Sequence, residues 1–424
     1  MVLQFIVTFN FTLFILFTLF YFYQIVYAVV GVVRRPKEPP VALKNHRYAV
    51  LIAARNESAV IAALIDSIKK QNYPQQLLDI FIVADNCTDN TAAVAKKAGA
   101  TAVYERFNHE QVGKGFALDF MLKSIARDYG PGAYEGYFVF DADNLLAENF
   151  VCEMNKWFDQ GYHVLTSYRN SKNYASNWLS AGYSLWVLRE SRYLNYPRMV
   201  LGTSCAISGT GFLVHSDIIR KNNGWKHHLL TEDIEFSVDC VINGEKIGYC
   251  HTAVLYDEQP CTWSQSWTQR LRWAKGFYQV FGRYYKQLVY GFAVKRQFGC
   301  YDMFMTIAPA LFVSLTSVAV NGIFLLTALL GADVAPKLIP LTTNAIFASM
   351  LNFYAALFVF GLLTTITERK RIHACAAKKI LYLFTFPIFI FTYVPISIVA
   401  LFKKIHWSPI THNISRSIEE MVHQ

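Results

Sequence analysis

The chain has 424 residues, of which 54% are hydrophobic, and it carries a formal net charge of +10. This composition excludes an ordinary soluble protein and predicts one substantial soluble domain joined to membrane segments. The charge would suit nucleic acid, an anionic membrane or a phosphate-bearing substrate, so the position of the basic residues has to decide. Because basic residues border the long apolar tracts, we expect a membrane protein and not a nucleic-acid-binding one.

An almost wholly apolar segment covers residues 5–33 and is followed at once by Arg34, Arg35 and Lys37. It is long enough to cross a bilayer, and basic flanks stay in the cytoplasm. We therefore expect residues 1–35 to form a transmembrane helix with the N-terminus outside. A cleaved signal peptide is the alternative, although no basic residue precedes the apolar run and no small-residue cleavage pattern ends it.

Residues 36–260 are expected to form a cytoplasmic α/β domain. The runs "RYAVLIAA", "DIFIVAD" and "YFVFDAD" are typical of buried strands, and a further strand is expected near residues 102–104. Helical spacing of apolar residues separates these strands, and Asn56 is expected to cap the first helix. This alternation predicts a parallel sheet with crossover helices.

Polar side chains collect where the predicted strands end. They are Arg55, Asn56, Asp85, Asp141 and Asp143. In open α/β sheets, ligands bind beyond the carboxyl ends of the strands, so we expect these side chains to face one crevice.

Asp141 and Asp143 of "FDADN" lie two residues apart at a strand end. Carboxylate oxygens suit Mg²⁺ or Mn²⁺ bridged to a diphosphate, although a solvated turn would show the same pattern. Lys114 lies between two glycines where a helix is expected to begin, which suits an anion site; a flexible capped loop is the alternative.

"LLTEDIEFS" places Glu232 and Asp233 before a helical pattern, with Thr231 as a candidate cap. Two readings remain open for these acids. They either stabilise the first turn of a helix, or one of them is a general base that deprotonates a hydroxyl in a cleft.

Residues 261–302 begin with "CTWSQSWTQRLRW" and combine tryptophans with closely spaced arginines. This stretch and residues 176–194 predict amphipathic helices at a membrane surface, with ordinary core aromatics as the alternative. A membrane surface alone does not require Gln269, Arg270 and Arg272 together, so we expect an anionic group nearby.

Residues 303–402 are expected to form the remaining membrane region. Spans are predicted at 303–330 and 341–366. The tract 380–402 carries Pro387 and Pro395 and has lysines on both sides, so we favour a broken interfacial or re-entrant segment over a further span. Residues 403–424 would then be a cytoplasmic tail.

The ordered set of motifs resembles the membrane-integrated family 2 glycosyltransferases of the processive type, such as cellulose, hyaluronan and poly-N-acetylglucosamine synthases. The matching motifs are "AARNE" at residues 53–57, Asp85, "DAD" at 141–143, "TED" at 231–233 and "QRLRW" at 269–273. The likeness covers residues 50–285. It implies a glycosyltransferase A-type nucleotide-sugar-binding domain combined with transmembrane and interfacial helices.

For the donor side, the resemblance implies that Glu57 and Asp85 lie beside the uracil and ribose of a UDP-sugar, near Arg55. Lys114 would lie near the same nucleotide. Trp407, in "KKIHWSPITH", resembles by position a tryptophan on a loop that closes over the nucleotide, although the residues after it depart from that pattern.

For the reaction itself, the resemblance implies that Asp143 coordinates Mg²⁺ or Mn²⁺, with Asp141 close to the metal. Asp233 would be the base, with Glu232 beside it. From "QRLRW", Gln269 and Arg272 would hold the diphosphate. Trp273 would stack on the acceptor sugar.

The expected protein is an inverting enzyme of the plasma membrane that polymerises a β-linked polysaccharide from UDP-N-acetylglucosamine or UDP-glucose at the cytoplasmic face and translocates it. Transfer of a single sugar to a membrane lipid is the alternative. Expected partners are the growing glycan or lipid acceptor and membrane lipids, with a homo-oligomer or accessory export subunits left open. A receptor or scaffold that only binds nucleotide or sugar is a third hypothesis.

Overall fold

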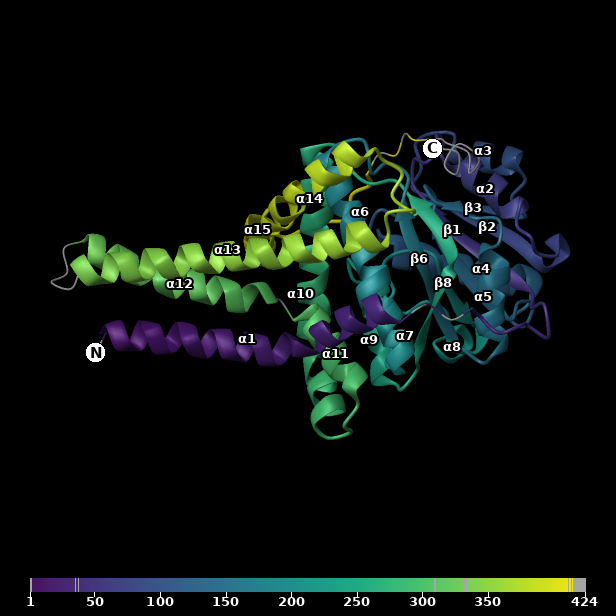
Figure 1. The fold of residues 1–424 in the computed structure, drawn as a ribbon. Helices are drawn as coiled ribbons and strands as arrows, with labels where there is room; N and C mark the ends of the chain where they lie inside the picture. The colour runs from purple at the N-terminus through teal and green to yellow at the C-terminus, as the bar shows by residue number, and fades with distance from the viewer. Residues whose placement is uncertain are drawn as a thin grey trace.

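The computed structural model describes residues 2–34, 36, 38–308, 310–330, 335–410, 412 and 414. It consists of an α/β domain and a set of long helices that project from one side of that domain (Figure 1). An eight-stranded sheet in the order β3-β2-β1-β4-β7-β6-β8-β5 forms the centre of the domain. All candidate catalytic motifs belong to this domain or to the helix that lies between it and the projecting helices.

The first half of the sheet is parallel, as the sequence predicts. It contains β1 (Tyr48–Ala54), β2 (Leu78–Asp85), β3 (Ala102–Arg106) and β4 (Gly136–Asp141). The crossover helices are α2 (Ile61–Lys69), α3 (Thr91–Ala98) and α4 (Lys114–Tyr129), with the short helix η1 (Gln75–Leu77) before β2. α3 ends at Gly99, whose φ of 87° is the left-handed conformation that glycine adopts without strain.

The second half of the sheet mixes strand directions. β7 (Phe212–His215) is antiparallel to both β4 and β6 (Val164–Ser171), and β8 (Ile247–Asp257) is parallel to β6. The two-residue strand β5 (Leu145–Leu146) pairs antiparallel with β8. A register shift between Ser167 and Tyr168 interrupts the β6–β8 pairing, and bulges of this kind redirect side chains near functional sites.

Further helices complete the domain, namely α5 (Phe150–Asp159), α6 (Trp178–Glu190), η2 (Ser191–Asn195), α7 (Tyr196–Leu201), α8 (Ser216–Lys221) and α9 (Glu232–Ile242). A reciprocal capping box between Asn177 and Ser180 fixes the start of α6. The predicted cap at Asn56 is wrong. α2 begins after Val60 without a side-chain cap, and Asn56 instead accepts a hydrogen bond from the backbone N–H of Thr88.

Among the described residues, three segments are long and apolar enough to cross a membrane, namely Gln4–Val33, Pro336–Thr367 and Ala376–Phe402. The first two belong to α1 (Val2–Val33) and α13 (Ala335–Thr367). These helices project side by side with α12 (Ala310–Leu329), and α10 (Trp263–Ala293) lies across their base (Figure 1).

The predicted continuous span at 303–330 is wrong. α11 (Phe298–Ile307) ends before Ala308, which adopts an extended conformation, and α12 begins at Ala310. The residue before a proline is pushed out of the helical region, and Pro309 follows Ala308 in the sequence. The apolar tract is therefore divided between one short helix against the domain and one projecting helix.

The expected break in residues 380–402 is present at Thr392, and Pro395 favours it, because a proline at 395 cannot donate a helical hydrogen bond to the carbonyl of Phe391. α14 (Ala376–Phe391) contains Pro387, whereas α15 (Tyr393–Phe402) starts after Thr392 and carries Pro395 in its first turn. Arg270 of α10 donates to the carbonyl oxygen of Phe389 and to the Thr392 hydroxyl. A buried guanidinium therefore satisfies backbone oxygen at the point where the helix breaks.

Candidate active site

The carboxyl ends of β2, β1 and β4 bring three predicted site residues to one edge of the sheet. The strand register pairs Ala54 with Ala84, and Ala53 with Asp141. Arg55 and Asp85 follow these positions directly. Because β1 lies between β2 and β4, the three side chains start from neighbouring strands of this edge.

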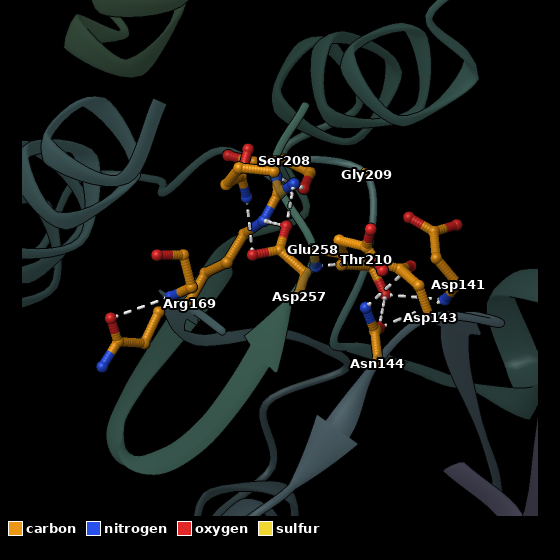
Figure 2. Close-up of polar contacts among 12 residues, drawn as sticks. Asp141, Asp143, Asn144, Arg169, Ser208, Gly209, Thr210, Asp257 and Glu258 are labelled. Atoms are coloured by element: carbon orange, nitrogen blue, oxygen red, sulfur yellow. Dashed lines mark hydrogen bonds and ion pairs between the residues drawn. The ribbon is translucent and has the colours of Figure 1, made fainter. Parts of the chain in front are cut away.

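The loop at residues 208–210 holds the first aspartate of the "DAD" motif in place (Figure 2). The backbone N–H of Asp141 donates to the Thr210 hydroxyl over 2.9 Å and to the Asn144 side chain over 3.2 Å. Thr210 in turn donates to Asn144. The "DAD" turn and the loop before β7 therefore form one hydrogen-bonded unit.

Gly209 marks the space that two of the predicted motifs share. Its φ is 80°, and a Cβ atom added there would lie 3.9 Å from Asp141 Oδ2 and 4.0 Å from Asp233 Oδ2. The structure thus brings the "DAD" and "TED" carboxylates to the same small space, although they are far apart in the sequence. A side chain at residue 209 would enter that space.

An ion pair behind this loop fixes its position (Figure 2). Arg169 Nε donates to Asp257 Oδ2 over 2.6 Å, and Arg169 Nη1 donates to the carbonyl oxygen of Ser208 over 2.8 Å. Asp257 ends β8, and the next residue, Glu258, donates its backbone N–H to Asp143 Oδ2 over 2.7 Å. One end of β8 therefore supports both the loop and the second aspartate of "DAD".

Asp143 is buried and ionised. Burial raises the pKa of this carboxyl, but the positive charges of His412, Lys172 and Arg169 and the hydrogen bond from Glu258 outweigh burial, so the pKa is lowered. Lys172, at the end of β6, has its own pKa lowered by burial, although Asp143 opposes this shift. The sequence reasoning missed Lys172, because no recognised motif surrounds it.

Lys114 contacts the first "DAD" aspartate directly. Its ammonium lies 2.6 Å from Asp141 Oδ1 and donates to the Gly209 carbonyl oxygen over 2.6 Å. Gly115 follows it, and a Cβ atom there would lie 2.1 Å from the His227 carbonyl oxygen. The glycine is thus needed for the close approach that brings the start of α4 to the site.

Glu232 and Asp233 form the first turn of α9. Burial raises the pKa of both carboxyls, and their mutual repulsion helps to raise the pKa of Glu232 to about 7. The backbone N–H of Ile234 and the ammonium of Lys114 oppose the shift at Asp233. Carboxyl groups with raised pKa values suit general-base chemistry.

Thr231 does not cap α9 as expected. It occupies the N-cap position, but its side chain makes no capping hydrogen bond, and its hydroxyl has no partner among the described residues. A Cβ atom on Gly276 of α10 would lie 2.5 Å from the Thr231 side chain. The close approach of α10 at Gly276 therefore packs the "TED" turn against the helix that carries "QRLRW".

The two arginines of "QRLRW" have different surroundings. Arg270 is fully buried and is bound to α14 and Thr392, with its guanidinium 4.6 Å from the Phe389 ring centroid. Burial lowers the pKa of Arg272, and Glu232, Asp141 and Asp233 offset this shift only in part. An additional anion near Arg272 would therefore stabilise its charge.

Gln269 and Trp273 lie on the same helix but differ in surroundings. The buried Gln269 Oε1 has no hydrogen-bond partner in the part of the chain that the structure describes. Trp273 packs in a cluster with Leu179, Tyr183 and Phe389, and its ring lies 5.8 Å from the Tyr183 ring. The structure therefore places Trp273 against α6 and α14.

Asp85 is fixed by Arg106, a residue that the sequence reasoning missed. Asp85 and Arg106 are both buried, and Arg106 Nη1 lies 2.5 Å from Asp85 Oδ1. Burial raises the pKa of Asp85, and Arg106 opposes that shift. Arg106 ends β3, next to the end of β2, so the parallel pairing of these strands was the only sequence signal for this contact.

The C-terminal segment returns to the site. The Trp407 ring lies 5.2 Å from the Arg55 guanidinium and 5.8 Å from that of Arg272. His412 Nδ1 lies 3.0 Å from Glu57 Oε1, and the backbone N–H of Ile414 donates to Glu258 over 2.9 Å. Trp407 thus contacts arginines of two predicted motifs, and His412 is a site residue that sequence reasoning missed.

The acidic cluster fits a divalent cation bridged to phosphate. Burial opposes protonation of His412, but Asp143, Glu57 and Glu258 raise its pKa to about 10, so this place stabilises positive charge. A magnesium-like ion on a diphosphate needs only one or two protein carboxylates, which Asp141 and Asp143 provide. Among the described residues, no group of three or more His, Cys, Asp or Glu could hold a metal alone.

A family model described as Glycosyltransferase like family 2 matches residues 46–276. The chain belongs to glycosyltransferase family 2. The matched region contains the "AARNE", "DAD", "TED" and "QRLRW" motifs, so the expected membership of family 2 is confirmed. It also includes every strand of the sheet.

The curated relatives of this family 2 member include enzymes named for a lipid product and enzymes named for a polysaccharide product. The chain is 25% identical over 263 residues to a beta-monoglucosyldiacylglycerol synthase of Synechocystis, covering 59% of this chain and 53% of the relative. It is 24% identical over 242 residues to a poly-beta-1,6-N-acetyl-D-glucosamine synthase of Staphylococcus aureus, covering 54% of each. A probable glycosyltransferase of Bacillus subtilis, YdaM, is 25% identical over 61% of each chain. The chain thus spans about half to three fifths of these relatives.

Among solved structures, the fold is similar to that of the mannosyltransferase PcManGT from Pyrobaculum calidifontis, which was solved in complex with GDP-Man and Mn²⁺. The TM-score is 0.54 with 14% identity, and the match covers 93% of this chain and 99% of that chain. At this identity the likeness bears on the fold, and it confirms the predicted glycosyltransferase A-type architecture.

Proposed function

We propose that this family 2 member is an inverting glycosyltransferase that takes a hexose from a UDP-sugar and adds it to the end of a β-linked polysaccharide at a membrane surface. The observation that carries this proposal is the convergence of Asp141, Asp233 and Arg272 at one edge of the sheet. A nucleotide-sugar transfer needs these chemical groups together, namely a metal ligand, a base and a cation for the leaving group.

Donor binding is assigned to the edge formed by β1, β2 and β4. Asp85, held by Arg106, and Glu57 would bind the nucleoside, and Trp407 would cover it next to Arg55. Asp143 and Asp141 would hold Mg²⁺ or Mn²⁺, which when bound supplies positive charge to the diphosphate. Gln269, with its unpartnered oxygen, and Arg272 would complete the diphosphate site from α10.

The transfer itself uses one base and forms no covalent enzyme intermediate. The hydroxyl of the acceptor attacks the anomeric carbon while Asp233 takes its proton, and the bond from that carbon to the UDP oxygen breaks with its electron pair leaving on UDP. Arg272 stabilises the negative charge that develops on the leaving diphosphate. A single displacement inverts the configuration, so an α-linked donor gives a β-linkage.

The apolar helices and their basic flanks support a position in the plasma membrane. Arg34 follows α1, and the connector "ERKRIHACAAKK" follows α13. Because basic flanks stay in the cytoplasm, we propose that the α/β domain lies inside the cell and the N-terminus outside. α14 and α15 would lie at the interface as a broken pair against α10.

A second candidate is the transfer of one sugar to a membrane lipid. The similarity to the beta-monoglucosyldiacylglycerol synthases favours it specifically, while the poly-N-acetylglucosamine synthase favours the polymer. In both cases the acceptor would reach Asp233 past Trp273 of α10.

Product length separates the two candidates. Purified protein in bilayer discs would be incubated with radiolabelled UDP-N-acetylglucosamine or UDP-glucose, with Asp233→Asn as the control. A ladder or long product that a β-specific glycosidase degrades supports the polymerase. A single glycolipid in the organic phase supports lipid transfer instead, and UDP release without either product contradicts both.

A further inference from the structure

Residues 259–301 contain no aspartate or glutamate but contain seven basic residues. Four of these have contacts already: Arg270 at the helix break, Arg272 at the active site, Lys275 on the Ala400 carbonyl oxygen and Arg283 on Glu235. The remaining three lie at the C-terminal end of α10 or just beyond it, at residues 286, 295 and 296. This end of the helix is therefore a concentrated positive patch.

A groove opens at this end of α10. It has a volume of about 360 Å³ and is lined by Ile242, Lys286, Gln287, Tyr290, Gly291 and Lys295. In the part of the chain that the structure describes, each lysine contacts an aromatic ring and not a carboxylate. Lys286 Nζ lies 5.9 Å from the Tyr285 ring centroid, and Lys295 Nζ lies 5.8 Å from that of Tyr290.

Exposed apolar side chains lie in the groove lining and in the chain segment next to it. Tyr290, Val294 and Phe298 expose 55%, 62% and 42% of their surfaces, which is unusual for three large side chains so close together. Phe298 packs on Tyr23 of α1, and the Tyr301 hydroxyl donates to the Phe20 carbonyl oxygen. The segment that follows the groove in the chain therefore contacts α1, and α10, which lines the groove, crosses the base of the projecting helices (Figure 1).

We propose that this groove binds the headgroup of an anionic glycerophospholipid of the surrounding bilayer. Two ammonium groups and the Gln287 amide offer hydrogen bonds and positive charge to a phosphodiester, while the exposed Tyr290 and Val294 contact the glycerol and the first acyl carbons. The exposed apolar side chains in and next to the groove favour a bilayer lipid as the source of the phosphate over a soluble one.

The groove also shares a helix with the active site. Ile242 ends α9, and the same helix begins with Glu232 and carries Asp233 in its first turn. A lipid in the groove contacts the far end of the helix that carries the base and orients α10 on the membrane surface. This inference rests on the membrane position given in the proposed function, and it adds a ligand that takes no part in the transfer.

The full-length protein in non-ionic detergent would be titrated with phosphatidylglycerol or phosphatidylcholine, and bound lipid counted by native mass spectrometry. The test variant is Lys286→Gln with Lys295→Gln. The matched control is Lys96→Gln with Lys97→Gln, on α3 at the far side of the domain (Figure 1). Near a membrane each basic residue is worth roughly a fivefold change in affinity, so the test variant should bind the first phosphatidylglycerol about 30-fold more weakly.

The control variant should bind phosphatidylglycerol like the wild type, and both variants should unfold near the wild-type temperature because all four lysines are exposed. Equal phosphatidylglycerol affinity in the test variant, or equal affinity of the wild type for phosphatidylcholine, would overturn the proposal. Displacement of the lipid by an equal concentration of glycerol phosphate would also overturn it, since the site would then take soluble phosphate. UDP release is measured separately, so an inactive wild type would count against the proposed function alone.

Discussion

Arg270 and Arg272 offer a paired test, because they lie two residues apart on α10 and face different surroundings. Arg272→Ala removes the cation next to Asp141 and Asp233. Loss of one group that stabilises developing negative charge typically lowers the rate by about 10²–10³, or roughly 3–4 kcal/mol of transition-state stabilisation. The free energy of unfolding should change little, because the nearby carboxylates offset the cost of burying the charged Arg272 guanidinium only in part.

Arg270→Ala should have the opposite profile. The guanidinium is fully buried and donates to the carbonyl oxygens of Ser266 and Phe389 and to the Thr392 hydroxyl. Hydrogen bonds from a charged group contribute about 1.5–3 kcal/mol each, so losing the two to Phe389 and Thr392 should cost roughly 3 kcal/mol or more. The unfolding temperature should fall by several degrees.

The assay measures UDP release and thermal unfolding on the same preparations, with Arg272→Lys as a third variant. Arg272→Lys keeps the charge but not the planar fork, so it should retain more activity than Arg272→Ala. The reasoning is refuted if Arg272→Ala unfolds at a clearly lower temperature than Arg270→Ala, or if Arg270→Ala loses turnover while keeping wild-type stability.

Three further predictions concern the same site. Since a proton on the Glu232–Asp233 pair blocks the base and burial raises both pKa values, activity should rise with pH through about 7; a flat profile down to acidic pH would contradict this. Trp407→Ala removes a ring that contacts both Arg55 and Arg272. At about 0.5–2 kcal/mol for a cation–π contact, kcat/KM for the UDP-sugar should fall roughly two- to thirtyfold. Chelation should abolish transfer and Mn²⁺ or Mg²⁺ restore it, and Asp143→Asn should need more metal for half-maximal activity, measured as a metal titration of UDP release.

Local patterns in the sequence are sufficient to predict the parallel half of the sheet. The runs that became β1 and β2 are continuous and apolar, and helical spacing separates them, so period and length identify each element. β6 and β8 were not predicted, because their pairing joins residues far apart in the sequence and each strand also has an antiparallel neighbour. The break before α12 follows from Pro309. This local signal was overlooked because the length of the apolar tract alone predicted one span.

The same division holds for the site. Asp141 and Asp233 stand in recognisable motifs, and their convergence follows from the family resemblance. Arg106 and His412 carry no motif, and only the folded chain brings them to Asp85 and Glu57. Likewise, the family resemblance assigns Arg272 to the diphosphate but gives no role to Arg270, whose contact with the helix break at Thr392 is seen only in the folded chain.

The most direct test compares the binding of UDP and the transfer of sugar in Asp233→Asn. If this carboxylate is the base of a site that holds the nucleotide through other groups, the variant should bind UDP with Mn²⁺ about as tightly as the wild type. It should lose transfer by roughly a hundredfold or more. Transfer at the wild-type rate would contradict the assignment of the base, and loss of UDP binding together with transfer would contradict the separation of donor site and base.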